Sequence, residues 1–413
     1  MSICIHEARC ALGPEEAVHA SIEIAAGHIS RIAHTSAANR TTTSGCARID
    51  LGGFLLMPGL INAHDHLQFS LFPRLANPPY PNYIHWGKDI HAAFPEVIAM
   101  HKTVPKYVRL WWGGIRNLLS GVTTVCHHDP LWPELRQTNF PVQVLQQYSW
   151  AHSLALGGNL RAAHAATPRG CPFILHACEG IDDTVRQDVW QLDRLGLLDA
   201  DTVLVHALAL DPEGAALLRR HKASVILCPS SNQFLFGKTP RMSLLSGIEN
   251  LAIGNDSPLT AIGNLLDEVR FAVQICAISP RAAYRMVTTV PAAILRLNNA
   301  EGSITESGAA NLIAVRDTGN SPAHILQRLS ASDVELAMIA GRVQLASNTM
   351  LGRLPASAKK GLEPLSINGT IRWLRAPVTK LLEQAEQVVG PGNVRLSGAP
   401  VSIPQKATAA YGC

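Results

Sequence analysis

The first 50 residues of the chain alternate apolar and polar side chains in short stretches, a pattern that is typical of β-strands. Ser21-Ile22-Glu23-Ile24 and Ile29-Ser30-Arg31-Ile32 show it most clearly. Gly27 lies between these two stretches and is a signal for a hairpin turn. The N-terminal region is therefore expected to form a small β-sheet unit.

From Leu55 onward, continuous apolar runs replace the alternating pattern. The runs cover residues 55–61, 122–126, 142–146, 173–175, 203–205, 225–228 and 251–254. Segments with helical periodicity, such as 106–119 and 212–221, lie between them. Strands that alternate with helices predict a parallel sheet whose strands are buried on both faces. The expected fold class is α/β, with a (β/α) TIM-like barrel.

The regions on either side of the barrel are expected to share a smaller domain. Short apolar stretches at 302–304, 311–315 and 343–346 have the length of strands and are expected to pair with the N-terminal hairpins. The predicted units are a composite β-domain of residues 1–54 and 303–346, a barrel domain of residues 55–302, and a C-terminal extension of residues 347–413. One helix is expected in the extension, because Pro377 begins an amphipathic stretch and Gly390 follows it.

Composition narrows the classes of partner. The 413 residues are 47% hydrophobic and 16% charged, so the chain can bury a large core. The 35 basic residues barely outnumber the 31 acidic ones, and nucleic acid is therefore not an expected partner. No apolar stretch approaches the ~20 residues that span a bilayer, so no membrane partner and a cytoplasmic location are expected. Nine cysteines without a CxxC pair indicate reduced thiols rather than a disulfide framework.

Side chains that bind metals follow several of the apolar runs. In chain order they are His64, His66, His176, His206 and Asp256. Because barrel active sites form at the carboxyl ends of the strands, these side chains are expected to lie together. The chain has 17 histidines, so any one of them alone is more simply explained as a structural side chain.

The spacing of His64 and His66 allows both rings to face one point, because residues two apart in an extended segment project to the same side. His176 and Asp256 add a nitrogen and an oxygen ligand of the kind that Zn²⁺ or Fe²⁺ accepts. Glu179 follows His176 by three residues and is either a proton donor to a leaving group or a surface glutamate at a helix start. His206 is expected to orient a water molecule or a substrate atom.

Two further histidines follow predicted strands and are candidates for substrate contact. His128 comes after the run at 122–126, and His152 comes after the next strand. For each of them a packed side chain is an equally good interpretation.

Five motifs occur in the order found in metal-dependent amidohydrolases. They are Met57-Pro58-Gly59-Leu60-Ile61-Asn62-Ala63-His64-Asp65-His66, Leu175-His176-Ala177-Cys178-Glu179, Val205-His206, Cys228-Pro229-Ser230-Ser231-Asn232 and Gly254-Asn255-Asp256-Ser257. Over residues 1–345 the chain resembles the aminohydrolase branch of that superfamily, which includes N-heterocycle deaminases and triazine chlorohydrolases. The resemblance implies a barrel plus a small β-domain built from both chain ends.

The resemblance also implies a role for each matching residue. The metal ligands would be His64, His66, His176 and Asp256, and the catalytic residues would be Glu179, His206 and Asp256. Asn232 would lie at the rim of the substrate pocket or brace it. Binuclear relatives bridge two metals with a carboxylated lysine, but this chain has no lysine between Lys106 and Lys222. One divalent metal is therefore expected, Zn²⁺ or else Fe²⁺.

Two departures from the family pattern stand out. Only one clear strand, 142–146, falls between His128 and the strand of His176, where the family has room for two. One βα unit is therefore expected to be missing or compressed. The loop at residues 67–90 also matches none of the substrate loops of the named deaminases.

The expected function is metal-dependent hydrolysis, with deamination of an aminated N-heterocycle as the leading hypothesis. Hydrolysis of a cyclic amide, or of another C–N or a C–halogen bond, is the alternative that uses the same residues. A non-catalytic metal-binding scaffold is the alternative from another class. A small-molecule substrate is the expected partner, and assembly into a homo-oligomer is compatible with these features.

Overall fold

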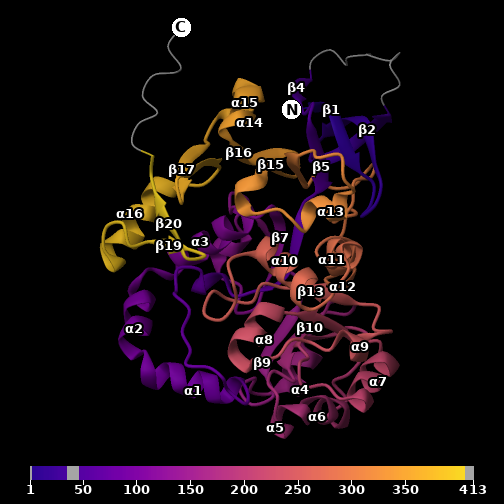
Figure 1. The fold of residues 1–413 in the computed structure, drawn as a ribbon, viewed down its shortest axis with the longest axis vertical. Coiled ribbons are helices and arrows are strands. Elements are labelled where there is room, and N and C mark those ends of the chain that lie inside the picture. Colours follow the sequence, from indigo (N-terminus) through magenta and orange to yellow (C-terminus); the bar gives the residue numbers. More distant parts are fainter. Residues whose placement is uncertain (1, 35–45, 405–413) are drawn as a thin grey trace.

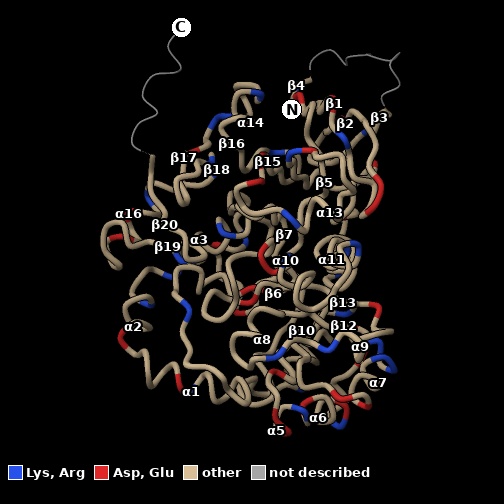
Figure 2. The backbone as a smooth tube through the Cα atoms, in the orientation of Figure 1, with Lys and Arg blue, Asp and Glu red and all other residues tan. Residues whose placement is uncertain are grey.

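The computed structural model describes residues 2–34 and 46–404. A mixed sheet lies at one end of the molecule, and two parallel sheets with their helices form the other end (Figure 1). Lys and Arg are interspersed with Asp and Glu along the described chain (Figure 2). Within the described residues, no helix has the length and apolar character needed to cross a membrane.

The mixed sheet contains twelve strands from both parts of the chain. The N-terminal ones are β1 (Ile3–Ala11), β2 (Ala17–Ala25), β3 (His28–His34), β4 (Ala47–Asp50) and β5 (Phe54–Pro58). The later ones are β14 (Leu312–Arg316), β15 (Val334–Ile339), β16 (Arg342–Ser347), β17 (Glu363–Ile367), β18 (Thr370–Leu374), β19 (Arg395–Leu396) and β20 (Ala399–Ser402). Their order is β19-β20-β17-β18-β16-β15-β14-β5-β1-β2-β3, with β4 beside β1. The antiparallel pair β5–β14 joins the two parts.

The predicted N-terminal hairpin is confirmed. Strands β2 and β3 pair antiparallel, with Ile22 opposite Ile32. Gly27 turns the chain at φ +85°, a left-handed conformation that glycine adopts without strain. A side chain there would also approach Ala340 of the turn between β15 and β16 to 3.3 Å.

Eight strands run parallel in the other part of the molecule. One sheet has β6 (Leu60–Asp65), β7 (Val122–His127) and β8 (Gln143–Val144). The other has β9 (Ser149–Ser153), β10 (Phe173–Ala177), β11 (Thr202–His206), β12 (Ser224–Leu227) and β13 (Leu251–Ile253). A parallel bridge between Asp65 and Asp256 joins the two sheets. The predicted parallel α/β arrangement is confirmed, and β10 and β11 are buried along their whole length as expected.

Most helices lie between these strands in the sequence. They are α1 (Tyr83–Ala93), α2 (Pro95–Thr103), α3 (Lys106–Leu119), α4 (Leu160–Ala165), α5 (Asp183–Arg186), α6 (Asp188–Arg194), α7 (Pro212–His221), α8 (Pro229–Phe236), α9 (Met242–Leu245), α10 (Leu265–Ile275), α11 (Pro280–Met286) and α12 (Thr289–Ile294). The predicted helices at 106–119 and 212–221 are α3 and α7. Helix α7 begins as its sequence suggests, with the Asp211 side chain accepting a hydrogen bond from the backbone N–H of Gly214.

The link between β8 and β9 is unusually short. Four residues, 145–148, separate the two strands, and they contain no helix. A crossover between parallel neighbours needs about a dozen residues or more. Strand β8 pairs with β7, and β9 pairs with β10. The two strands therefore form one interrupted extended segment rather than two complete βα units.

Three predictions about strands and segments were wrong. The run at 55–61 is split between β5 in the mixed sheet and β6 in the parallel sheet, because Gly59 lets the chain pass close to Thr123. Residues 302–304 form a turn instead of a strand, since Gly302 is left-handed and packs against the backbone of Thr288. The extension after residue 346 was predicted to hold one helix, but its described part contains several helices and also strands β17 to β20. The strands form because short apolar stretches turn at Gly369 and Gly398.

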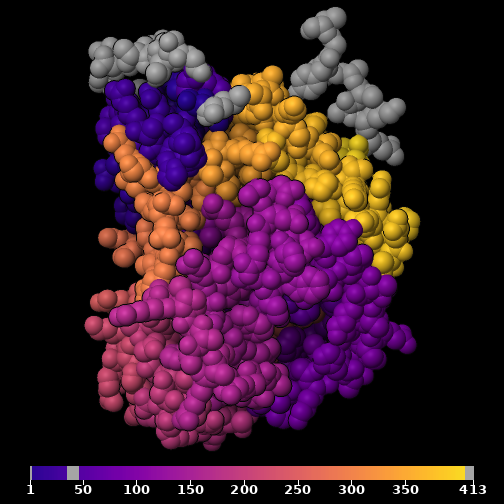
Figure 3. All heavy atoms as spheres, turned by 180° about the vertical axis from the view of Figure 1, so that it is seen from behind, coloured from indigo at the N-terminus to yellow at the C-terminus, as the bar shows by residue number. Residues whose placement is uncertain are grey.

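The C-terminal extension packs on the parallel part of the molecule. It adds helices α14 (Asn348–Arg353), α15 (Ala356–Lys359) and α16 (Val378–Val389), and α13 (Pro322–Leu326) precedes it. Trp112 of α3 donates its indole N–H to the carbonyl oxygen of Leu381 in α16, at 3.3 Å. Seen from behind, the yellow extension lies against the purple segment that contains α2 and α3 (Figure 3).

Cysteine usage differs in one respect from the sequence expectation. Cys4 of β1 and Cys46 form a disulfide bond, although they are 42 residues apart in the sequence and belong to no CxxC motif. Six other cysteines are buried free thiols, as expected. Cys413 lies outside the described residues.

Candidate metal centre and active site

The five predicted strand-end side chains lie together at the carboxyl ends of the parallel strands. His64 is in β6, His66 follows that strand, His176 is in β10, and His206 ends β11. Asp256 follows β13 after Gly254, where an added Cβ would lie 2.6 Å from that of His64. The lack of a side chain at residue 254 therefore lets the end of β13 pack directly against β6. The backbone N–H of Asp256 donates to the carbonyl oxygen of His64 at 3.1 Å.

The ligand atoms of this cluster are close enough to share one ion. His64 Nε2 lies 3.2 Å from His176 Nε2, and both His64 Nε2 and His66 Nε2 lie 3.7 Å from Asp256 Oδ1. The nitrogens of His64, His66 and His176 all lie within 4.8 Å of one another, and so do the ligand atoms of a second group, His64, His206 and Asp256. Four ligands at about 2.1 Å from a tetrahedral ion would be about 3.4 Å apart. The donor set and its spacing thus fit a single divalent metal.

Burial sets the protonation of these side chains. It lowers the pKa of His64 to about 4 and the pKa of His176 well below its ordinary value. Burial would raise the pKa of Asp256, but the neighbouring histidines outweigh it and hold this pKa well below the usual range. Burial also lowers the pKa of His66, yet hydrogen bonding and charge from Asp129 bring about a net increase. His64 and His176 are therefore held neutral beside an ionised Asp256, which are the forms that bind a metal, whereas His66 must lose a proton more readily than its surroundings favour in order to bind.

Further hydrogen bonds fix the orientation of the proposed ligands, and the sequence analysis missed their partners. Nδ1 of His66 lies 3.3 Å from Asp129, and Nδ1 of His176 lies 2.7 Å from the carbonyl oxygen of His152. Such contacts select the tautomer that leaves Nε2 free for the metal. Asp129 directly follows His127 and His128 at the end of β7, and this position was the one sequence signal for its role.

Two hydroxyl groups hold Asp256 from its other side. Ser231 donates to Asp256 Oδ2 at 2.7 Å, and Thr260 donates to the same oxygen at 3.1 Å. The Oδ1 atom is the one that faces His64 and His66. The carboxylate is therefore oriented by the hydroxyl groups as well as by the histidines.

A buried ion pair supports the backbone between His64, in β6, and His66, which follows that strand. Asp65 is fully buried and accepts two hydrogen bonds from Arg116 of α3, at 2.6 and 2.7 Å. It also accepts hydrogen bonds from Asn117 at 2.7 Å and Asn62 at 3.1 Å. Together these four hydrogen bonds satisfy the charge of Asp65 and fix the strand end that carries His64 and His66.

Glu179, His206 and Asn232 form a chain beside the cluster. Glu179 Oε1 lies 3.6 Å from His206 Nε2, and His206 Nδ1 lies 2.9 Å from the amide oxygen of Asn232. Asn232 thus braces His206. Burial, with a smaller contribution from Asp256, raises the pKa of Glu179 well above its ordinary value. His206 and Asp256 both have positive φ, at 75° and 54°, a strained conformation that is common at functional sites.

The two predicted substrate histidines lie beside the metal cluster. The ring of His128 is 4.3 Å from that of His176, and the ring of His152 is 5.0 Å from it. His128 is 1% exposed, and both of its ring nitrogens lack a hydrogen-bond partner among the described residues. Buried polar atoms without partners commonly mark a place where a ligand or water binds. Trp150 packs against His128 with ring centroids 5.1 Å apart.

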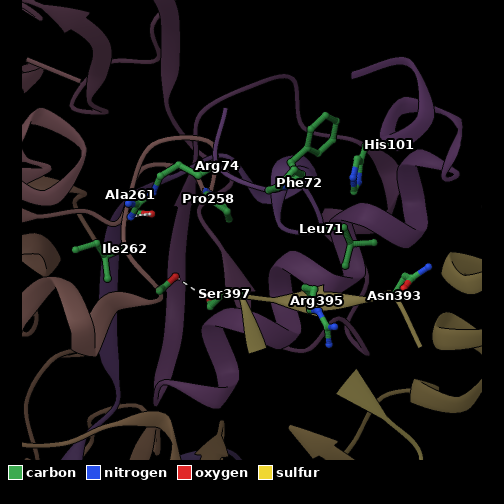
Figure 4. A pocket seen from close by; sticks show the side chains of 13 residues that line it. Leu71, Phe72, Arg74, His101, Pro258, Ala261, Ile262, Asn393, Arg395 and Ser397 are labelled. Atoms are coloured by element: carbon green, nitrogen blue, oxygen red, sulfur yellow. Dashed lines mark hydrogen bonds between the residues drawn. The ribbon is translucent and has the colours of Figure 1, made fainter. Parts of the chain in front are cut away.

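A separate cavity of about 470 Å³ lies beside the loop that follows Asp256 (Figure 4). Phe72, Pro258 and Arg395 are among its lining residues, and none of the predicted site residues is. Ser397 Oγ donates to the carbonyl oxygen of Gly263 at its edge, at 2.8 Å. The cavity is therefore distinct from the cluster.

Comparison with known proteins shows which families and chains this protein resembles. Residues 151–344 match the amidohydrolase family. The predicted amidohydrolase resemblance is confirmed. A 5-methylthioadenosine/S-adenosylhomocysteine deaminase of Syntrophobacter fumaroxidans is 26% identical over 399 residues, covering 80% of this chain and 87% of the relative. The deaminase of the same name from Saccharophagus degradans is 27% identical, covering 72% and 78%.

Two solved structures of zinc-bound enzymes share the fold of this chain. A zinc-bound adenosine deaminase from Xanthomonas campestris matches with a TM-score of 0.65 and 19% identity, covering 93% of this chain and 97% of its own. An atrazine chlorohydrolase from Arthrobacter aurescens, complexed with zinc, matches with a TM-score of 0.71 and 16% identity. The match covers 94% of this chain and 100% of the chlorohydrolase chain.

Proposed function

We propose that the chain is a metal-dependent hydrolase that deaminates an aminated N-heterocycle. The observation that carries the proposal is the cluster of His64, His66, His176 and Asp256 with a buried Glu179 beside it. The relatives named as deaminases support the same reaction class. Their substrates belong to those proteins, and for this chain the proposed class is a small aromatic ring with an exocyclic amino group.

The fold proposed for this function is a barrel that lacks one βα unit. The parallel pairings run from β8 through β7 and β6 to β13 and on to β9, with the bridge between Asp65 and Asp256 joining the two sheets. One buried cluster contains side chains from six of these strands, including Ile61, Ile174 and Ile226. The short link between β8 and β9 takes the place of the missing helix. The domain boundaries given above stay predictions.

A divalent metal held by these four ligands would lower the pKa of a bound water from 15.7 towards about 7. The proposed ligand set supports one metal per chain. The choice of zinc over iron, the cytoplasmic location and a homo-oligomeric state stay predictions.

The chain's own residues would move the protons. Asp256, held ionised by the neighbouring histidines, would accept a proton, and Glu179, held protonated by burial, would donate one to the leaving nitrogen. His206 would stabilise charge that develops near its Nε2 atom, with Asn232 fixing its orientation. His128 and His152 are proposed as substrate contacts.

A second candidate reaction uses the same residues. The zinc-bound atrazine chlorohydrolase shares the fold, so hydrolysis of a C–halogen bond or of a cyclic amide is the alternative. The two reactions differ in their products. A non-catalytic scaffold is the third candidate, and the complete ligand set argues against it.

The test is a screen of metal-loaded protein against aminated purines, pyrimidines, pterins and triazines, together with a chlorotriazine. Ammonia release with one metal per chain by elemental analysis is the expected result. Chloride release without ammonia would favour the alternative reaction. Turnover of none of these compounds, with metal bound, would contradict the proposal.

A further inference from the structure

A large groove lies away from the metal centre, where the mixed sheet meets the parallel strands. It has a volume of about 950 Å³. Its walls come from residues 135–147 around β8, residues 169–171 before β10, residues 295–301 after α12, and the turn between β15 and β16. None of the proposed metal, catalytic or substrate residues lines it.

The short link between β8 and β9 accounts for the groove. In a parallel βα unit a helix covers the outer face of the strand. Residues 145–148 contain no helix, and Gln143, Val144 and Leu145 line the groove instead. Clefts at the junction of two structural units are common ligand sites, and ligand pockets typically measure about 300–1,000 Å³.

The charge around the groove is strongly unequal. Arg136, Arg169 and Arg342 come from three separate segments, line the groove and are exposed. In the described part of the chain, no ion pair or side-chain hydrogen bond engages any of these three guanidinium groups. A fourth lining arginine, Arg296, is paired with Asp201 at 2.9 Å.

The one acidic residue that lines the groove within the described residues does little to balance this charge. Glu301 accepts hydrogen bonds from Thr124 at 2.5 Å and from Asn311 at 3.1 Å. Burial raises its pKa above the ordinary value, which weakens its negative charge.

We infer that this groove binds a phosphorylated small molecule of nucleotide size. Guanidinium groups form paired hydrogen bonds with phosphate oxygens, and three unpaired ones around a single groove favour a ligand with more than one negative charge. The amide of Asn298 and the amide nitrogen of Gln143 also line the groove and can form hydrogen bonds with a polar body such as a sugar or a base. The amide oxygen of Gln143 already accepts hydrogen bonds from Thr124 and Asn311. The inference is independent of the proposed reaction at the metal centre.

The test is calorimetric titration of the full-length protein with ADP and, separately, with fructose 1,6-bisphosphate. The two probes distinguish a nucleotide from a sugar phosphate, and fructose is the uncharged control. The variants are Arg169→Gln and Arg342→Gln. The matched control is Arg281→Gln, because Arg281 of α11 is exposed and lies outside the groove.

At least one phosphorylated probe is expected to bind, while fructose does not. Each groove variant should weaken that binding about 10-fold or more, and Arg281→Gln should leave it unchanged. Absence of binding by both probes would overturn the inference. Binding of a probe with the same affinity to the groove variants and the wild type would also overturn the inference, because the probe would then bind elsewhere, for example at the metal centre.

A single-stranded RNA serves as a third probe. RNA binding that depends on Arg169 and Arg342, without binding of either small probe, would also overturn the inference and identify a nucleic-acid surface. Ammonia release by the groove variants, measured in parallel, reports on the metal centre separately.

Discussion

Two buried carboxyl groups at the strand ends have pKa values displaced in opposite directions. Histidines surround Asp256, and their hydrogen bonds and charges stabilise its ionised form. Glu179 is equally buried, has no cation as a close partner and lies near the charge of Asp256, so its protonated form is favoured. One environment therefore supplies a proton acceptor and a proton donor side by side.

Glu179→Gln is expected to keep the metal and lose most of the turnover. The amide preserves the shape of the side chain but cannot transfer a proton, and general acid–base groups typically contribute about 10²–10⁴-fold. The measurements are kcat and metal content on the same preparation. Loss of the metal would make Glu179 a ligand, and near-normal kcat would assign the proton transfer to another residue.

A third buried carboxyl group, Glu268 of α10, should influence stability rather than chemistry. Burial raises its pKa from 4.5 to about 8. The folded chain therefore holds a proton that the unfolded chain releases between these values. The stabilisation is complete below pH 4.5 and is lost as the pH rises through about 8. Its size is at most about 5 kcal/mol, since one pKa unit corresponds to about 1.4 kcal/mol.

Glu268→Gln should flatten this pH dependence, because the amide does not titrate. The measurement is the free energy of unfolding by urea at pH 5.5, 7 and 8.5. Glu249→Gln is the matched control, since Glu249 is exposed. Equal slopes for wild type and Glu268→Gln would show that Glu268 ionises normally.

At the residue scale, the sequence predicted the proposed metal ligands but not the residues that hydrogen-bond to them. The ligands follow apolar runs and have a distinctive spacing, so pattern alone could bring them together. Asp129 and Thr260 lie in loops and Ser231 lies in α8, so their hydrogen bonds depend on how three separate segments pack together. A lone aspartate or hydroxyl residue in a loop carries no periodic signal.

At the scale of elements, the contact between β6 and β13 depends on Gly254. Gly254→Ala would place a Cβ 2.6 Å from His64 Cβ and 2.9 Å from its backbone nitrogen. The backbone of β13 cannot move away without displacing His64. We therefore expect loss of metal and a decrease of about 1–3 kcal/mol in the free energy of unfolding.

Gly87→Ala in α1 is the matched control for this substitution. An added Cβ there meets nothing within 4 Å, and alanine favours the helix. The measurements are the metal content and the thermal unfolding midpoint of both variants, and only Gly254→Ala should lower them. Unchanged metal binding in Gly254→Ala would show that β13 can move without disturbing His64.

The elements themselves were predictable where length and pattern agreed. Helices α3 and α7 and strands β10 and β11 have long or uniformly apolar sequences. The split at Gly59 was not predictable, because strands β5 and β6 are both apolar and only their partners differ. The strands after residue 360 are short and half-buried, so their pattern resembles that of loops.

At the scale of the whole molecule, the C-terminal extension is part of the fold. Strand β18 covers the edge of β16, and α16 buries Leu381 and Leu382. A chain that ends at residue 346 is expected to be insoluble or to lose at least about 10 °C in thermal midpoint, because apolar faces lose their cover.

A chain that ends at residue 404 is the control, since it keeps every described contact. Thermal unfolding followed by circular dichroism compares the two. A cooperative transition of the shorter chain at the wild-type temperature would mean that the extension is an independent appendage.

The composite sheet also constrains how the chain is made. Strand β5 is synthesised about 250 residues before its partner β14, so the N-terminal strands leave the ribosome long before the sheet is complete. During that interval the apolar faces of β1 and β5 have no partner from the later strands. The nascent chain should therefore be a ligand for chaperones until translation passes β16. Long-range pairing of this kind also makes folding slow, because a large loop must close before the contacts form.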